Sequence, residues 1–506
     1  MCKGLTSAVT TTRDPGDLNV AGDEGPNIPF DVEARTAIAG TLMERDPIVD
    51  YLHLKLEYDL DYFTSSLLVT KTKNQLGWVF DEREYLDLHS GTSPDLNGRD
   101  DTNLASLLKR NIVELRLVSD KERKLDWIAG LYYAVNRSQG NLQTEYSGPD
   151  QLLWGVIPII IGEPAKDEET ISNSAENAFY GEVGFNFINT TRFLIGYRRS
   201  SLHSQVEFVK LGGFFNELTG GDFNEGKTLK TQEVVNTFKV ALEHEFSEDL
   251  FTYALLSTGY RGGGYNSATP LSPFSTYDSD KLTNYEFGLK SILMNGLLRT
   301  TVSGYLLRYD DIQLVVQQPV YFNRVTNNVG KAQNMGLEFG MDWFLSEKLH
   351  LNVNGSMSKP ELLEDVQPSK VFEYDVNRVV VDSHYVYTGR KGDRLPGSAN
   401  ESFSVSLEFN QPINKNIGFF SSANYRYVGT RLNDFNLDLD VELPAYALTD
   451  LRLGLSFGSG LRVTLFVDNL FDEAIIYYID RQGSTGYEMV PTNRPRTTGL
   501  NLSFNV

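Results

Sequence analysis

Apolar and polar residues alternate along most of the chain from about residue 50 onward. In one stretch, Tyr285 and Phe287 alternate with Asn284, Glu286 and Gly288. Successive side chains of a β-strand point to opposite faces, so this pattern predicts strands with one apolar and one polar face. The same alternation recurs at residues 52–58, 125–136, 336–343, 402–409, 450–457 and 500–506. No convincing run follows the period of a helix, so the pattern predicts an all-β protein.

The length of these strands favours a membrane barrel over a soluble sandwich. The predicted strands span roughly 9–14 residues, and a tilted strand needs about 9–11 residues to cross a bilayer. Strands of soluble proteins average about 5–6 residues. The polar faces carry Glu, Lys, Arg, Asn and Gly, which suits the wall of a water-filled lumen.

The connections between predicted strands alternate strictly in length. Short turns are predicted at residues 59–61, 119–123, 189–191, 247–249, 295–296, 346–348, 411–415 and 458–460. Long polar stretches lie between them, such as residues 79–108, 139–172, 202–228, 262–280, 359–396 and 429–442. Outer-membrane barrels have short periplasmic turns at one rim and long extracellular loops at the other. The chain is therefore predicted to be a transmembrane antiparallel β-barrel.

Aromatic residues cluster beside the short turns. They include Tyr58, Tyr62, Trp127, Phe187, Phe193, Phe246, Phe251, Trp343, Phe344, Phe409, Phe419 and Phe457. Aromatic residues favour strands in general, but barrels also carry a girdle of them at each membrane interface. Because they recur at the same rim, we interpret them as an interfacial girdle.

The strand count predicts an incomplete barrel. About 17 strands are expected, whereas bacterial barrels have an even number with both termini in the periplasm. The first strand runs toward a short turn, so upstream strands are expected to be missing, and the full number would be the 22 of plugged transporters. Residues 1–46 are polar and are predicted to form a loop or a disordered start, and residues 47–506 the barrel.

Composition excludes several functional classes. The net charge is −21 and the pI is near 4.8, which argues against nucleic acid because phosphate binding needs a basic face. The single cysteine, Cys2, excludes a disulfide framework and a cysteine-based zinc site. No run approaches the roughly 18 apolar residues of a membrane helix.

Several segments resemble a known family. The stretches YALLSTGYRGGGYN (253–266), NYEFGLKS (284–291), RYDDIQ (308–313) and NVGKAQNMGLE (328–338) resemble strands of TonB-dependent outer-membrane receptors, as do LPAYALTD (443–450), VDNLFDE (467–473) and RPRTTGLNLSF (494–504). Each motif is weak alone. Their order across residues 250–506 makes the resemblance strong, and residues 50–250 fit more loosely.

The resemblance implies a receptor of the Gram-negative outer membrane that takes up a large scarce nutrient, most often a ferric siderophore; cobalamin or an oligosaccharide is an alternative. In this family a plug domain fills the barrel and contacts TonB. Neither the plug nor its TonB box is recognisable here, so coupling to TonB is expected only when a plug is supplied. The expected partners are membrane lipid and the ligand, with the barrel as a monomer and without a cofactor. The family's terminal aromatic is replaced by Val506, two positions after Phe504.

No residue pattern indicates catalysis, a metal site or a defined substrate site. The stretch Gly454–Gly458 matches a nucleophile elbow, but Ser456 lies on an alternating strand instead of a strand–turn–helix. The six histidines, His244 among them, form no metal-ligand spacing. The acidic clusters 361–365 and 434–442 are interpreted as solvated loops that could also attract cations, and the glycines 262–264 as a turn.

Two other functions remain open at this stage. A passive porin-like channel would have the same strand pattern with an open lumen. An outer-membrane enzyme would need a serine and a histidine in contact, for which Ser456 and His244 are the only candidates.

Overall fold

The computed structural model describes residues 9–13, 44–45, 48–81, 99–120, 124–147, 152–153, 157–158, 164–213, 225–266, 276–317, 324–366, 369–374, 380–386, 389–433, 442–478, 480–482 and 487–504. Most of these residues lie in one large antiparallel sheet of 17 long strands, the barrel wall. In chain order its strands are β3 (Ile48–Asp59), β4 (Phe63–Asp81), β5 (Arg99–Ser119), β6 (Leu125–Ser147), β9 (Pro164–Ile188), β10 (Thr191–Gly212), β11 (Thr228–Ser247), β12 (Leu250–Arg261), β15 (Asp280–Leu293), β16 (Leu298–Asp310), β19 (Ala332–Phe344), β20 (Leu349–Leu362), β23 (Glu401–Asn414), β24 (Ile417–Val428), β27 (Tyr446–Phe457), β28 (Leu461–Asp468) and β31 (Thr497–Phe504).

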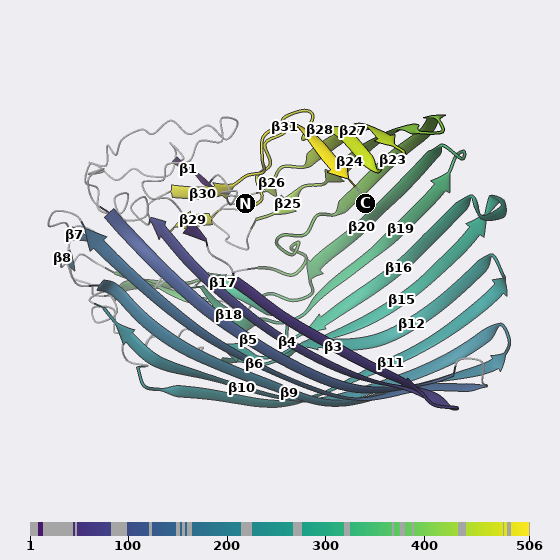
Figure 1. The fold of residues 1–506 in the computed structure, drawn as a ribbon. Helices are drawn as coiled ribbons and strands as arrows, with labels where there is room; N and C mark the ends of the chain where they lie inside the picture. Colours follow the sequence, from purple (N-terminus) through teal and green to yellow (C-terminus); the bar gives the residue numbers. More distant parts are fainter. Residues whose placement is uncertain are drawn as a thin grey trace.

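Each strand of the wall pairs with the next one along the chain, from β3 through to β31. Figure 1 shows these strands side by side, curving as one wall in sequence order. The predicted all-β fold and strand number are confirmed. Among the described residues the exception is η2 (Met294–Gly296), a single 3₁₀ turn that contains the predicted turn 295–296. No helix in the described part of the chain is long and apolar enough to cross a membrane.

The two rims of the wall differ as the sequence predicts. At one rim, here called the turn rim, only a few residues join neighbouring strands, as at 189–190 and 458–460. At the other, the loop rim, small hairpins occupy the longer connections. They are β7–β8 (Leu152–Leu153, Ile157–Pro158), β13–β14 (Gly264–Tyr265, Thr276–Tyr277), β17–β18 (Gln313–Gln317, Arg324–Asn328), β21–β22 (Ser369–Tyr374, Val380–Val386) and β25–β26 (Arg431–Leu432, Glu442–Leu443).

Part of the polar start also forms strand structure. Segment β1 (Val9–Arg13) pairs with β30 (Tyr487–Pro491), which also pairs with β29 (Asp480–Gln482). Segment β2 (Glu44–Arg45) pairs with β4. The remainder of residues 1–46 lies outside the described residues.

Several strands are longer than the sequence predicts. Strands β6 and β9 span 23 and 25 residues, well beyond the expected length. They and their neighbours extend into stretches 79–108, 139–172 and 202–228, which were expected to be loops. The extension has a simple physical cause: a polar hairpin arm still satisfies its backbone N–H and C=O groups by pairing with the adjacent arm.

The two faces of the wall are chemically distinct. On β15, Tyr285 and Phe287 point to one face and are about half exposed, whereas Glu286 and Lys290 point to the other. Polar contacts on the second face join strands that are not neighbours: Arg192 of β10 binds Asp126 of β6 across β9. Tyr260 of β12 also reaches Glu176 of β9 across two intervening strands, and contacts over such distances favour a concave polar face. We therefore call it the inner face and the apolar one the outer face.

Most of the predicted girdle residues are consistent with an outer position, but two are not. Phe187 and Phe246, near the turn rim, are more than 60% exposed on the outer face. The ring of Phe251 instead lies 5.9 Å from the Lys290 ammonium on the inner face. Phe344 stacks on His350, which binds Asp342 on the inner face. Proximity to a turn therefore predicted the correct rim but not the correct face.

Candidate functional site

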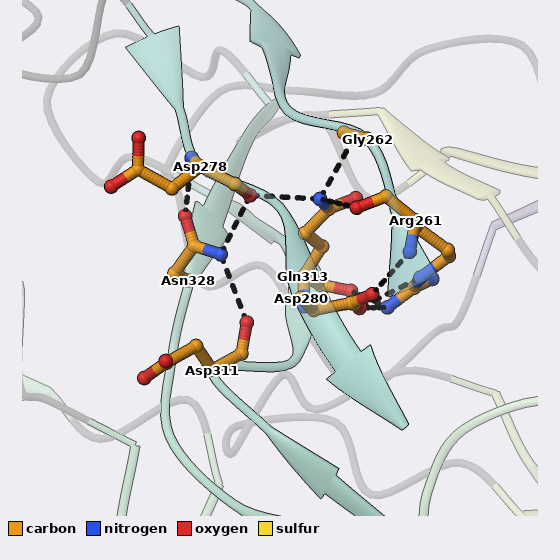
Figure 2. Close-up of polar contacts among 7 residues, drawn as sticks. All are labelled: Arg261, Gly262, Asp278, Asp280, Asp311, Gln313 and Asn328. Carbon is orange, nitrogen blue, oxygen red and sulfur yellow. Dashed lines mark hydrogen bonds and ion pairs between the residues drawn. The ribbon is translucent and has the colours of Figure 1, made fainter. Parts of the chain in front are cut away.

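A network of polar side chains joins two connections at the loop rim, the one between β12 and β15 and the one between β16 and β19 (Figure 2). Asp280, at the start of β15, is almost completely buried. Its carboxylate accepts hydrogen bonds from the backbone N–H of Arg261 at 3.0 Å, from the Arg261 guanidinium and from the backbone N–H of Gln313 at 3.2 Å. One buried charge therefore holds the ends of β12 and β15 and the start of β17.

Two amide side chains complete this rim network. The Gln313 amide donates to the carbonyl oxygens of Gly262 at 3.1 Å and Asp278 at 2.9 Å. The Asn328 amide donates to the carbonyls of Asp278 and Asp311, both at 2.9 Å, and its oxygen accepts from the Asp278 N–H. Figure 2 shows both amide side chains, from the connection between β16 and β19, directed at backbone groups that include Asp278 and Gly262 of the connection between β12 and β15. The network therefore fixes the bases of these two loops relative to one another.

The predicted glycine turn at 262–264 lies against this network. A Cβ atom at Gly263 would overlap the Glu233 carboxylate and the Tyr277 carbonyl oxygen. The requirement for glycine here comes from close packing of neighbouring segments. We therefore revise the interpretation from turn chemistry to close approach.

An apolar cluster lies beside the rim network. Its buried members are Ile312, Val329, Ala332, Leu362 and Val366. They come from the ends of β16, β19 and β20 and the adjacent loop segments. Because these side chains bury apolar surface together, the loop bases form a packed platform with its own small core.

The acidic clusters predicted in the loops have specific partners where they are described. Glu361 pairs with Lys359 at 2.7 Å, and Asp365 accepts the Lys391 N–H at 2.8 Å. Glu442 accepts from the Thr430 hydroxyl at 2.6 Å and the Arg394 guanidinium at 2.9 Å. The Thr430 and Arg394 contacts hold the pKa of the Glu442 carboxyl below its ordinary value. Residues 434–441 lie outside the described residues.

A second polar group lies on the inner face, where four strands contribute. Glu176 accepts hydrogen bonds from Arg198 at 2.7 Å, Ser200 at 2.8 Å and Tyr260 at 3.1 Å. The Arg198 guanidinium lies 5.0 Å from the centre of the Tyr132 ring. This inner-wall group combines the carboxylate, a cation and aromatic surface, which can bind a polar, partly aromatic ligand.

Further ion pairs line the inner face toward the turn rim. The Arg192 guanidinium bridges Asp126 and Glu243, and Lys239 binds Glu182 at 2.9 Å. Paired charges of this kind keep the inner face hydrophilic, as a lumen wall requires.

The catalytic candidates do not form a site. The Ser456 hydroxyl donates to the Gly418 carbonyl at 3.4 Å, and His244 contacts Thr191 at 2.8 Å. Strand β27, which carries Ser456, is separated from β11, which carries His244, by seven strands of the ladder. Within the described ranges no group of three potential metal ligands occurs.

The sequence did not identify the rim network or the inner-wall group. The residue types were visible on the polar faces of the strands, but their partners lie up to 84 positions away. Tyr260 contacts Glu176 beyond the last paired residues of the ladder between β11 and β12, so the alternation of strand residues does not predict this contact. The family motif at 253–266 contains Tyr260, Arg261 and Gly262, so it marked this segment without indicating the partners of these residues.

Comparison with known proteins decides the family. The family model described as TonB-dependent receptor-like β-barrel matches residues 5–470 of this chain. The chain belongs to this family. Its members are receptors and transporters, so the enzyme alternative is not supported.

Individual relatives of this TonB-dependent receptor barrel are distant in sequence. The pesticin receptor of Yersinia pestis is 22% identical over 408 residues, which are 80% of this chain and 52% of that protein. The chain thus spans about half the length of the curated relatives it matches.

Solved structures show the same fold. The ferric yersiniabactin uptake receptor FyuA of Yersinia pestis superposes with a TM-score of 0.69 at 19% identity, covering 91% of this chain and 61% of FyuA. The siderophore receptor PiuA of Acinetobacter baumannii gives a TM-score of 0.67 at 12% identity, covering 91% and 64%.

Proposed function

We propose that this barrel lies in the outer membrane of a Gram-negative bacterium and takes up a large scarce nutrient, a ferric siderophore. The observation that carries the proposal is the packed loop rim above a polar inner face. The rim network fixes loop bases, and the inner-wall group offers Arg198, Glu176 and Tyr132 to a polar ligand.

The relatives support the ligand class. Their names include a ferric yersiniabactin uptake receptor and a siderophore receptor. We propose that ligand is first captured at the loop rim and then passes along the inner face. Transport energised through TonB requires a plug, which we propose is supplied with the barrel in the working receptor.

Direct binding to the purified chain tests this proposal. Catecholate, hydroxamate and phenolate siderophores, each with and without iron, are titrated while tryptophan fluorescence is recorded. We expect one ferric chelate class to bind at least about tenfold more tightly than its iron-free form, a difference of about 1.4 kcal/mol. Equal affinity for every chelate, or no binding, would contradict the proposal.

A pair of glutamine variants ties binding to the rim. Gln313→Ala removes three amide contacts of the rim network and is expected to weaken ferric chelate binding several-fold. Gln411→Ala, near the turn rim, removes only a contact to Pro412 and serves as the matched control.

A steady ion conductance in planar bilayers without chelate binding would instead favour the porin-like alternative.

A further inference from the structure

A polar basin lies on the inner face of the wall, from β16 to β24. Its volume is about 520 Å³, within the range of about 300–1,000 Å³ that is usual for small-molecule pockets. Ser303 of the basin pairs with Gly288, two positions from Glu286 on the same side of β15, so the basin opens to the inner face. Two rows of laterally paired residues form its floor: Ser303, Glu338, Ser356, Ser402 and Val428 in the first row, and Thr301, Gly340, Asn354, Ser404 and Arg426 in the second.

Small polar side chains surround the centre of the basin. A Cβ atom at Gly340 would lie 2.7 Å from the Thr301 hydroxyl oxygen and 3.2 Å from the Asn354 amide oxygen. The hydroxyls of Ser356 and Ser402 form a hydrogen bond with each other at 2.9 Å. Polar oxygen atoms thus converge at the centre of the basin, where they can accept hydrogen bonds from the N–H groups of a ligand.

The basin also carries two charged side chains of opposite sign. Glu338 and Arg426 are both exposed, and within the described residues neither side chain forms a hydrogen bond or an ion pair. Other charges of the inner face, such as those of Arg192 and Lys239, are paired with carboxylates. The charges of Glu338 and Arg426 are therefore available to a ligand.

The spacing of these two charges explains why they do not pair with each other. Glu338 on β19 and Arg426 on β24 are separated by three strand spacings, about 14 Å, and lie in adjacent rows. An extended tripeptide spans up to about 10 Å. A peptide of this size bridges the basin, because the two long side chains cover the remaining distance.

We infer that the basin binds a short peptide that has a free ammonium group and a free carboxylate. The Arg426 guanidinium binds the peptide carboxylate through two parallel N–H···O bonds, and Glu338 accepts hydrogen bonds from the ammonium group. A peptide that lacks one of these groups leaves one protein charge unpaired, so the basin discriminates against it. The inference goes beyond the proposed function, since the peptide contains no iron and does not bind at the loop rim.

Calorimetric titration of the purified full chain with triglycine tests the inference. We expect saturable binding of one triglycine per chain. N-acetyl-triglycine lacks the ammonium group and triglycine amide lacks the carboxylate, and each is expected to bind at least about tenfold more weakly. No binding of triglycine, or equal binding of all three peptides, would overturn the inference. Ferric chelate binding is measured on the same preparation, so that its failure, which concerns the proposed function, is distinguished from failure of peptide binding.

Two glutamine variants assign the two ends of the peptide. In Glu338→Gln we expect the penalty for N-acetylation to disappear and the penalty for amidation to remain, and in Arg426→Gln we expect the opposite result. Each comparison is made within one variant, so partial loss of folded protein does not alter it. Glu408→Gln and Arg462→Gln, on the inner face nearer the turn rim, are the matched controls and should keep both penalties. Unchanged penalties in Glu338→Gln and Arg426→Gln would also overturn the inference.

Discussion

The phenol ring of Tyr253 covers Gly288, its direct partner across the ladder between β12 and β15. The Tyr253 hydroxyl also donates a hydrogen bond to the Glu286 carboxylate at 2.5 Å on the inner face. A Cβ atom at position 288 would overlap the ring. The same arrangement recurs at Gly130 with Tyr180 and at Gly336 with Tyr305. Glycines on the inner face thus provide room for aromatic rings that lie flat against the wall.

Substitution of this glycine is expected to destabilise the wall. Gly288→Ala forces the Tyr253 ring to move and is predicted to lower the free energy of unfolding by about 1–3 kcal/mol. Gly259→Ala, whose Cβ would meet only Leu282 at 3.9 Å, is the control and is expected to have a much smaller effect. Urea unfolding monitored by fluorescence measures both. In a Tyr253→Ala background the effect of Gly288→Ala should shrink; an unchanged effect would show that the ring is not responsible.

The buried carboxylate of the rim network is expected to be important for loop stability. Asp280→Asn keeps the shape but loses the charge that binds Arg261, and we expect a loss of about 1–3 kcal/mol in the free energy of unfolding. Asp310→Asn, at the end of the neighbouring strand, removes only an exposed pairing with Lys331 at 3.9 Å and should cost below about 0.5 kcal/mol. Similar losses for both variants would mean that the buried Asp280 charge contributes no more to the free energy of unfolding than an exposed ion pair does.

The link between Glu442, Thr430 and Arg394 is expected to depend on pH. Because the folded state lowers the pKa of Glu442, its contribution is complete above the ordinary value of 4.5 and is lost as the pH falls through the lower folded value. Protection of the chain at residues 430–433 and 442–443 from an acid-active protease should therefore decrease below about pH 4.5. The Glu442→Gln variant should show weak protection at every pH. A wild-type protection that is constant down to strongly acidic pH would contradict this assignment.

The sequence predicted the fold because most strands carry their own two-faced pattern. Leu453 and Arg452, for example, are assigned to opposite faces by position alone, and their ladders to β24 and β28 keep that assignment. The length of β6 and β9 was not predictable, since the pairing of polar arms depends on the partner and not on hydrophobicity. Phe251 was misassigned because only the register with Lys290 reveals its face. The contact of Tyr260 with Glu176 was not predictable either, because it joins residues 84 positions apart and the pattern of neither strand indicates the partner.

Arginine substitutions on the two faces of β27 should differ in cost. Leu453 is about half exposed on the outer face, and Ser456 has the opposite orientation. Leu453→Arg is expected to lower the free energy of unfolding in lipid vesicles by about 2–4 kcal/mol, the usual penalty within the apolar band. Ser456→Arg should cost much less because its side chain enters water. Equal penalties would argue against this assignment of faces.

Spin labelling of β27 directly measures whether the outer face contacts lipid and the inner face contacts water. Cys2, the chain's one cysteine, is replaced by serine, and single labels are placed at positions 450–457 of the vesicle-inserted chain. Collisions with oxygen and with a water-soluble nickel complex are then measured by electron paramagnetic resonance. We predict that labels at Leu451, Leu453 and Leu455 collide mainly with oxygen, and labels at Asp450 and Arg452 mainly with nickel. Equal accessibility at odd and even positions, or the reverse alternation, would contradict the claim.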